Sequence, residues 1–387
     1  MATVGTLTVS PVPTSPALLP FSKRQTANGG KPLIKSESAV SVPEKVIFDP
    51  KKHLAYSPPS KLHTMEELGY PESRGVSPIG VSEPFPLFTP EAIQQMRAEV
   101  FKNEVWDKYQ FSSNLAQCQL RGFAAECAPF IYDVWKSPET LSIISKIAGV
   151  DLVPAIDLEI GHINISVQSE EEKNKELAAV EEKKATDVDW KDDDPIVDWH
   201  TDSYPFVCVT MLSDCSTMVG GETALRKANG EVVKVRGPQM GSAVILQGRY
   251  IEHQALRALG TTERISMVTS FRPRSSAVKD DTVLTTVRPI SDLGELYHQF
   301  AEYRFDILQD RFRDANRLIR DQKRAKRQFD TRGIKRFIRE QIQFLEHMDK
   351  EMVDDDKVTK GVVDDSHLIS EDLKEKQNRK REVEEAL

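Results

Sequence analysis

Two histidines and one aspartate in the middle of the chain have the types and order of a metal-binding triad. His200 and Asp202 form a His-x-Asp pair, and His253 follows 51 residues after Asp202. Side chains at positions i and i+2 of a β-strand point to the same face. His200 and Asp202 can therefore project together, while a histidine from a distant strand completes a triangle. Two imidazoles and one carboxylate leave three octahedral positions open, as in the facial triad of non-haem Fe(II) oxygenases.

An arginine eleven residues after His253 can hold a ligand of such a metal. Arg264 follows at a distance that allows a turn and entry into the next antiparallel strand. Its fork of donors matches a carboxylate bidentately, so it suits the far carboxylate of a keto acid that chelates iron. Ser266 lies two residues further on, on the same face of a strand, and can donate another hydrogen bond. Arg257, four residues after His253, is the alternative anchor, although we place it in the connection between strands.

Each of these residues also has an ordinary structural explanation, and two other functions stay open. A lone histidine or a His-x-Asp pair is commonly a hydrogen-bonded part of a core or surface, and a lone arginine is commonly a surface residue. Two imidazoles and a carboxylate also suit catalytic zinc, but a zinc hydrolase would need a general base that the sequence does not identify. A third possibility is a non-catalytic scaffold that binds a partner through its C-terminal helices.

The segment 196–272, which holds the triad, has the texture of short β-strands. It is rich in Val, Ile, Thr and Phe. Asn229-Gly230 between two such runs predicts a hairpin with a type I′ turn, which needs two residues with positive φ. Gly220-Gly221 predicts another strand break. Upstream, 152–167 alternates with period two and predicts a further strand, in which Asn164 shares a face with His162 and Ser166.

Helical patterns flank this region on both sides. Thr89-Pro90-Glu91 has the cap, proline and acid of a helix start, and apolar stripes cover 124–148. We expect these helices to support the sheet. A longer pattern over 291–353 predicts two C-terminal helices, which could form a homo-oligomer. Basic residues crowd 311–339, but interspersed acids favour a solvated, salt-bridged face over a nucleic-acid site.

Composition and charge limit the class of protein, and they also divide the chain into four parts. The net charge of -8 argues against a protein that coats nucleic acid, and no apolar run approaches the length of a membrane span. Four cysteines without C-x-x-C spacing indicate reduced thiols, and the N-terminus is a poor secretory signal, although its Ser and Thr content is similar to that of a transit peptide. We therefore expect a cytoplasmic protein and leave a nuclear or organellar location open. The expected parts are a disordered or extended arm at 1–60, a catalytic domain at 61–290 with an acidic insertion at 169–194, C-terminal helices at 291–353 and a disordered charged tail at 354–387.

The central stretch resembles the 2-oxoglutarate- and Fe(II)-dependent dioxygenases, in particular the prolyl-4-hydroxylase-like branch. The resemblance covers about 77 of 387 residues, and the chain as a whole resembles fungal dioxygenase-domain proteins. Prolyl hydroxylases often have lysine where Arg264 stands, which leaves a carboxylate anchor but puts a protein-proline substrate in doubt. The matching pieces are His200-Thr201-Asp202, the GGET of 220–223, the strand start Gly241-Ser242-Ala243, His253, and Arg264-Ile265-Ser266.

The resemblance implies an α+β fold: a double-stranded β-helix (jelly roll) with flanking helices. It implies that His200, Asp202 and His253 bind Fe(II), that Arg264 and Ser266 hold 2-oxoglutarate, and that Asn164 contacts it. O2 would be the second co-substrate, succinate and CO2 would be released, and a small-molecule or peptide substrate would be hydroxylated. By the same analogy, we expect the barrel interior to receive Tyr204, Phe206 and Cys208.

Overall fold

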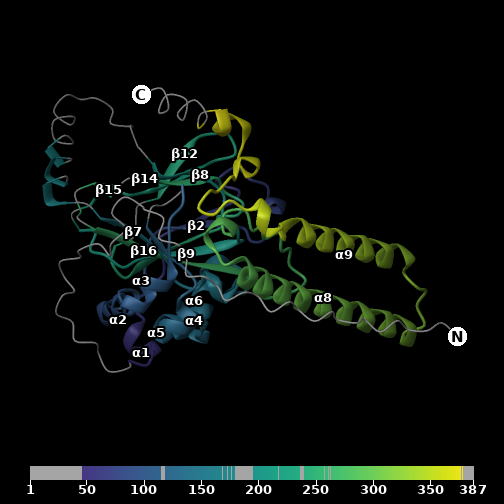
Figure 1. Ribbon diagram of the computed structural model, residues 1–387. Coiled ribbons are helices and arrows are strands. Elements are labelled where there is room, and N and C mark those ends of the chain that lie inside the picture. Colours follow the sequence, from purple (N-terminus) through teal and green to yellow (C-terminus); the bar gives the residue numbers. More distant parts are fainter. Residues whose placement is uncertain are drawn as a thin grey trace.

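A computed structural model of the chain shows two antiparallel β-sheets with helices around them (Figure 1). Among the residues that it describes, no helix is long and apolar enough to cross a membrane. The predicted Arg257 and residues 179–194 of the acidic insertion lie outside the described part of the chain. The described residues are 46–114, 118–167, 169–171, 173–175, 177–178, 195–216, 218–235, 239–256, 258–259, 261, 263–375 and 377.

The larger sheet has ten strands, and all of its pairings are antiparallel. Its strand order is β1-β2-β13-β9-β16-β7-β5-β4, with β3 also on β13 and β6 also on β16. The strands are β1 (Leu62–Thr64), β2 (Ile79–Ser82), β3 (Phe85–Pro86), β4 (Gln110–Phe111), β5 (Gln119–Leu120), β6 (Leu152–Pro154), β7 (His162–Val167), β9 (Phe206–Met211), β13 (Ser242–Leu246) and β16 (Glu263–Pro273).

The smaller sheet has the order β12-β11-β14-β8, and a separate pair joins β10 to β15. The hairpin predicted at Asn229-Gly230 joins β11 to β12, but its turn is not type I′. Gly230 has a φ of +85° and Asn229 has no positive φ, so the loop is a longer one with a single left-handed residue. The strands are β8 (Pro195–His200), β10 (Val219–Gly220), β11 (Thr223–Arg226), β12 (Val232–Val235), β14 (His253–Leu256) and β15 (Ala258–Leu259).

The chain passes back and forth between the two sheets. In chain order β7 and β9 lie in the larger sheet with β8 in the smaller one between them, and β13 and β16 lie in the larger sheet with β14 between them. The sheets also share one apolar cluster, in which Val207 and Val244 of the larger sheet pack with Leu225 and Val235 of the smaller one. One face of the larger sheet is therefore turned toward the smaller sheet, and we call the space between them the intersheet space.

Helices cover the opposite face of the larger sheet, as expected for the N-terminal helical patterns. α2 (Pro90–Val100) is capped by Thr89, whose hydroxyl accepts a hydrogen bond from the Ala92 N–H. The Trp135 ring packs edge-on against Phe271 and Phe88, and burying so large a ring stabilises the contact of helix and sheet. The other main helices of this layer are α3 (Asn103–Tyr109), α5 (Pro129–Lys136) and α6 (Pro138–Ala148).

Both ends of the described chain differ from the expectation of disorder. Residues 46–60 include a short helix, α1 (Pro50–His53), and Phe48 packs against Phe130. In the region expected as a charged tail, residues 354–375 lie along the folded domain, with three apolar side chains buried. Those side chains are Val363, Ile369 and Leu373.

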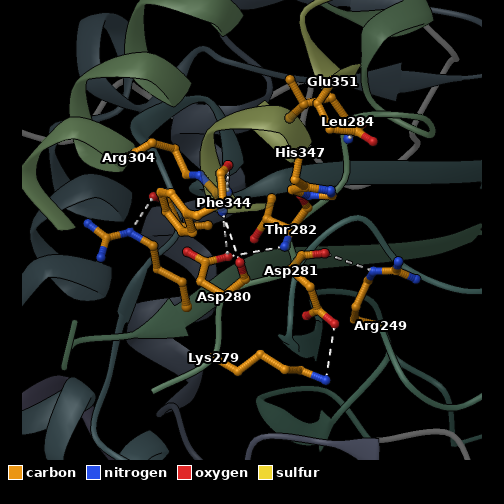
Figure 2. A network of polar contacts seen from close by, with 12 residues as sticks. Arg249, Lys279, Asp280, Asp281, Thr282, Leu284, Arg304, Phe344, His347 and Glu351 are labelled. Carbon is orange, nitrogen blue, oxygen red and sulfur yellow. Dashed lines mark hydrogen bonds and ion pairs between the residues drawn. The ribbon is translucent and has the colours of Figure 1, made fainter. Parts of the chain in front are cut away.

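Two long C-terminal helices, α8 (Leu293–Arg324) and α9 (Thr331–Glu351), form a hairpin that projects from the sheets (Figure 1). Hydrogen bonds join the base of the hairpin to residues 280–284, which follow β16 in the chain (Figure 2). The fully buried Arg304 donates to the Asp280 carbonyl at 3.0 Å and lies over the Phe344 ring at 3.5 Å. From α9, the Glu351 carboxylate accepts the Leu284 N–H at 2.7 Å.

Arg304 also forms a buried ion pair with the Asp280 carboxylate at 3.5 Å. Substitution Arg304→Met is expected to lower the free energy of unfolding by about 3 kcal/mol, because it leaves this carboxylate without its cation. Urea denaturation measures this loss. The matched control is Arg313→Met in the same helix, where the ion pair with Asp310 is solvent-exposed and its loss should cost less than about 1 kcal/mol. Equal losses in the two variants would contradict a stabilising role for the buried pair.

Candidate metal centre

The antiparallel pairing of β14 with β8 places the two predicted histidines side by side. His253 lies opposite His200 in the register, and their ring centroids are 4.3 Å apart. On the other side of β14, His253 lies opposite Leu225, whose side chain packs in the cluster between the sheets. Directly opposed residues of neighbouring strands point to the same face, so both imidazoles point into the intersheet space.

Backbone carbonyl groups fix the orientation of both imidazole rings. Nδ1 of His200 lies 2.7 Å from the Asp198 carbonyl oxygen, and Nδ1 of His253 lies 2.9 Å from the Ile251 carbonyl oxygen. A carbonyl only accepts, so each Nδ1 carries the hydrogen and each Nε2 presents a lone pair. Burial also lowers the pKa of His253 to about 4, which favours the neutral imidazole that binds metals.

The Asp202 carboxylate completes the triangle. Its Oδ1 lies 3.7 Å from Nε2 of His200, and its Oδ2 lies 3.6 Å from Nε2 of His253. One ligand atom from each residue lies within 4.8 Å of the other two. Among the described residues, the buried Oδ2 has no hydrogen-bond partner, which is costly unless another group satisfies it. These donors fit a divalent transition metal, and both Fe(II) and Zn(II) accept imidazole and carboxylate ligands.

Gly248, which the sequence does not mark as a site residue, allows the main chain to pass directly beside this carboxylate. The Asp202 N–H donates to the Gly248 carbonyl at 3.0 Å. A Cβ atom at position 248 would collide with Asp202 Oδ2 and approach the His253 ring to 3.2 Å. Only glycine keeps the carboxylate in place here, although no local sequence signal marks it apart from the chain's other glycines.

Residues 280–284, which bond to the base of the hairpin, also bond next to the candidate metal ligands. Val283 N–H donates to the carbonyl of Ser203, the neighbour of Asp202, at 3.0 Å. Arg249, the neighbour of Gly248, donates from Nε to the Asp281 carbonyl at 3.3 Å (Figure 2). The turn that holds Asp202 and the turn that contains Gly248 are thus attached to one segment, which the base of the hairpin holds on its other side.

The last described segment of the chain is bonded next to both histidines. Gln377 Nε2 donates to the carbonyl of Trp199, which precedes His200, at 3.0 Å. Ser370 N–H donates at 2.6 Å to the carboxylate of Glu252, which precedes His253. We call 361–377 the C-terminal strap. It also carries Asp365, whose pKa is raised by burial, while the nearby His200 acts in the opposite direction.

The predicted co-substrate residues lie on the facing surface of the larger sheet. Ser266 is opposite Asn164 in the register. Arg264 and Ser266 share a strand face with Val268, which packs against the intersheet cluster. Burial lowers the pKa of Arg264, and its Nε has no hydrogen-bond partner among the described residues. A half-buried guanidinium whose buried Nε has no protein partner fits an anionic ligand.

The predicted interior positions of Tyr204, Phe206 and Cys208 are wrong. Phe206 and Cys208 belong to the core under the helices, and Tyr204 packs with the base of the hairpin. Residues 201–205 are not in a strand, so the period of two does not continue from Asp202 into β9. Val207 points into the intersheet space instead.

A buried polar cluster lies at the start of β7. Arg121 and Glu159 form an ion pair with nearly no exposed surface, and Ser270 donates to Glu159 at 3.2 Å. Burial would raise the pKa of Glu159, but Arg121 holds it below its usual value. Burial also lowers the pKa of His162 to about 4, and Arg121 adds to that shift. His162 is therefore neutral near pH 7.

Comparisons with known proteins find remote structural similarity. No family model and no curated protein matches the chain. The matching solved structures include a 2OG-Fe(II) oxygenase family oxidoreductase from Burkholderia pseudomallei (14% identity, 42% of this chain and 63% of that chain, TM-score 0.28), AviO1 from Streptomyces viridochromogenes (14%, 57% and 98%, 0.34) and a Pseudomonas putida prolyl-4-hydroxylase (17%, 51% and 94%, 0.28). The chain thus spans less than two thirds of the first of these. Similarity at this level does not assign a family.

Substitution Gly248→Ala is expected to weaken metal binding about 10- to 100-fold, because the added methyl group displaces the Asp202 carboxylate. Titration of the metal-free protein with Fe(II) or Mn(II) measures the affinity. The control is Gly294→Ala in α8, where a Cβ atom meets only Asp292 at 3.3 Å. Unchanged affinity in Gly248→Ala would show that this close approach does not position the ligand.

Substitution His162→Gln is expected to reduce the acid sensitivity of the metal-free protein. Unfolded His162 titrates near pH 6.5 and folded His162 near 4, so the unfolded chain binds the extra proton between these values. Unfolding free energy contributed by this residue is present above pH 6.5 and is lost as pH falls toward 4, by about 2 kcal/mol. Urea denaturation at pH 6.5, 5.5 and 4.5 compares the slopes; parallel slopes would contradict the assignment.

Proposed function

We propose that the chain is an Fe(II)- and 2-oxoglutarate-dependent oxygenase on a double-stranded β-helix. The observation that carries the proposal is the triangle of His200, Asp202 and His253, with both Nε2 atoms facing a carboxylate whose buried oxygen lacks a partner. The passage of the strands between two facing sheets supports the fold, because a jelly roll is a double-sheet architecture built in this way. This makes the chain an oxidoreductase.

His200, Asp202 and His253 would hold the iron, and a ligand set of two imidazoles and one carboxylate leaves coordination positions open for other groups. With iron bound there, O2 and 2-oxoglutarate supply an oxidation in which 2-oxoglutarate becomes succinate and CO2 and an oxygen atom reaches the substrate. The chain's own contribution is positional. The Asp198 and Ile251 carbonyls fix the two rings, and Gly248 leaves room for the carboxylate.

Arg264 supports the choice of 2-oxoglutarate as the co-substrate. A dicarboxylate that chelates a metal at one end has a free carboxylate at the other, and the Arg264 fork can bind it in two hydrogen bonds. Ser266 and Asn164, opposed across β16 and β7 on the same face, can donate further hydrogen bonds to it. Binding would end the unpaired state of the buried Arg264 Nε.

The two other functions have less support. A zinc hydrolase on the same ligands gives no role to the half-buried Arg264, whose Nε has no hydrogen-bond partner among the described residues. A non-catalytic scaffold would tolerate separated ligands, whereas the three donors here lie within 4.8 Å. The substrate is proposed to be a small molecule or peptide.

With Fe(II) and ascorbate, the purified chain is expected to convert 2-oxoglutarate slowly to succinate, measured by chromatography. His200→Ala should abolish metal binding and turnover. Arg264→Met should raise the half-saturating 2-oxoglutarate concentration at least about 100-fold, because a charged hydrogen-bonded pair is lost, and should leave metal affinity within about threefold. The exposed Arg313→Met is the control. If Arg264→Met binds 2-oxoglutarate as well as the unsubstituted chain, the co-substrate assignment is wrong.

A further inference from the structure

The projecting hairpin of α8 and α9 exposes a row of large apolar side chains that its own packing does not cover. Five of them are between 43% and 49% exposed, which is high for side chains of this size: Phe305, Phe312, Ile338, Ile342 and Leu345. Contiguous exposed apolar residues commonly mark a site of protein association. The tip of the hairpin exposes two more, Leu318 and Phe329.

These residues recur at alternating spacings of three and four residues, which place them in one line along each helix, as in the contact line of a coiled coil. We call each such line a seam. In α9 the seam is Lys335, Ile338, Ile342, Leu345 and Asp349. In α8 the seam is Glu302, Phe305, Gln309, Phe312 and Asn316.

Both seams lie on the same side of the hairpin. The helices touch where Arg311 donates to Gln341, and the Phe337 ring also reaches Phe312 at the edge of the α8 seam. From Arg311 and Gln341, the middle of each seam lies roughly a third of a turn further round its helix in the same sense, at 3.6 residues per turn. Because the helices are antiparallel and their contact residues face each other, this rotation carries both seams to one side. The Arg311 contact also places Gln309 and Ile342 at similar heights.

Charge is distributed unevenly along the hairpin. The tip, 313–339, holds eleven basic and three acidic residues, a net charge of +8. The base, 293–310 with 340–351, holds two basic and eight acidic residues, a net charge of -6. Two hairpins packed tip to tip would repel each other, whereas two hairpins packed tip to base would attract.

We propose that this face binds a second copy of the chain, with the two hairpins antiparallel about a two-fold axis near Ile342. Lys335 and Asp349 each lie seven residues from Ile342, so each lysine meets the partner's aspartate across the axis. Neither residue has an ion pair among the described contacts. A two-fold contact is self-complementary, and this seam is complementary to its own reversed copy. A nucleic acid would match the tip alone and would be repelled by the base.

Sedimentation velocity of the full chain over a dilution series tests the proposal. The unsubstituted chain should be a dimer at low salt and should dissociate as salt rises, since the attraction between tip and base is screened. Ile342→Glu places two carboxylates against each other on the axis and should raise the dimer dissociation constant at least about 100-fold. The control Val232→Glu changes an equally exposed residue on β12 and should leave the dimer intact.

A charge exchange distinguishes the antiparallel arrangement from any other. Lys335→Glu and Asp349→Lys should each raise the dissociation constant about tenfold, and the chain that carries both should return to within about threefold of the original. Lys326→Glu, with the same charge change in the connecting loop, should have little effect. A chain that is monomeric at low salt, or a double variant that is not restored, overturns the proposal; so does a monomer whose seam binds an RNA oligonucleotide.

Discussion

The pairing of β14 with β8 is the constraint on which the candidate site depends. This pairing sets His253 opposite His200. The pairing of β14 with β11 sets His253 opposite Leu225, whose side chain faces the intersheet space, and so places both histidines on that face of the smaller sheet. A slip of β8 by one residue would turn the His200 imidazole out of the intersheet space, while His253 stays in place through its pairing with β11. Asp202 lies beyond the strand, so its place depends on a second contact, the close approach of Gly248.

The base of the α8–α9 hairpin also restrains the candidate site, through the segment that follows β16. Arg304 and Glu351 hold the segment that follows β16, and that segment bonds to Ser203 and Arg249 beside the ligand turn. Packing inside the helical hairpin and the geometry of the metal ligands are therefore connected through a short run of buried polar contacts. Buried networks of this kind favour one arrangement strongly, because any partly satisfied alternative leaves a charge without a partner.

The grouping of His200, Asp202 and His253 could be predicted from the sequence because their types and order match those of a metal-binding triad. The directions of nearby side chains could not be predicted in the same way. Counting by twos from Asp202 fails at Phe206 because the intervening residues leave the strand. The strap was expected to be disordered because its many charges hide the spacing of Val363, Ile369 and Leu373. The role of Gly248 depends on a contact between two turns, which no local pattern records.

The C-terminal strap has a practical consequence for handling the protein. Its last described contact, from Gln377 to Trp199, leaves the chain directly beside the residue that precedes His200. A Gly/Ser-rich linker of ten residues spans on the order of 15–20 Å. A histidine-rich affinity tag fused after this point would bring competing imidazoles within reach of the metal centre, so metal titrations are better made on protein tagged at its other end.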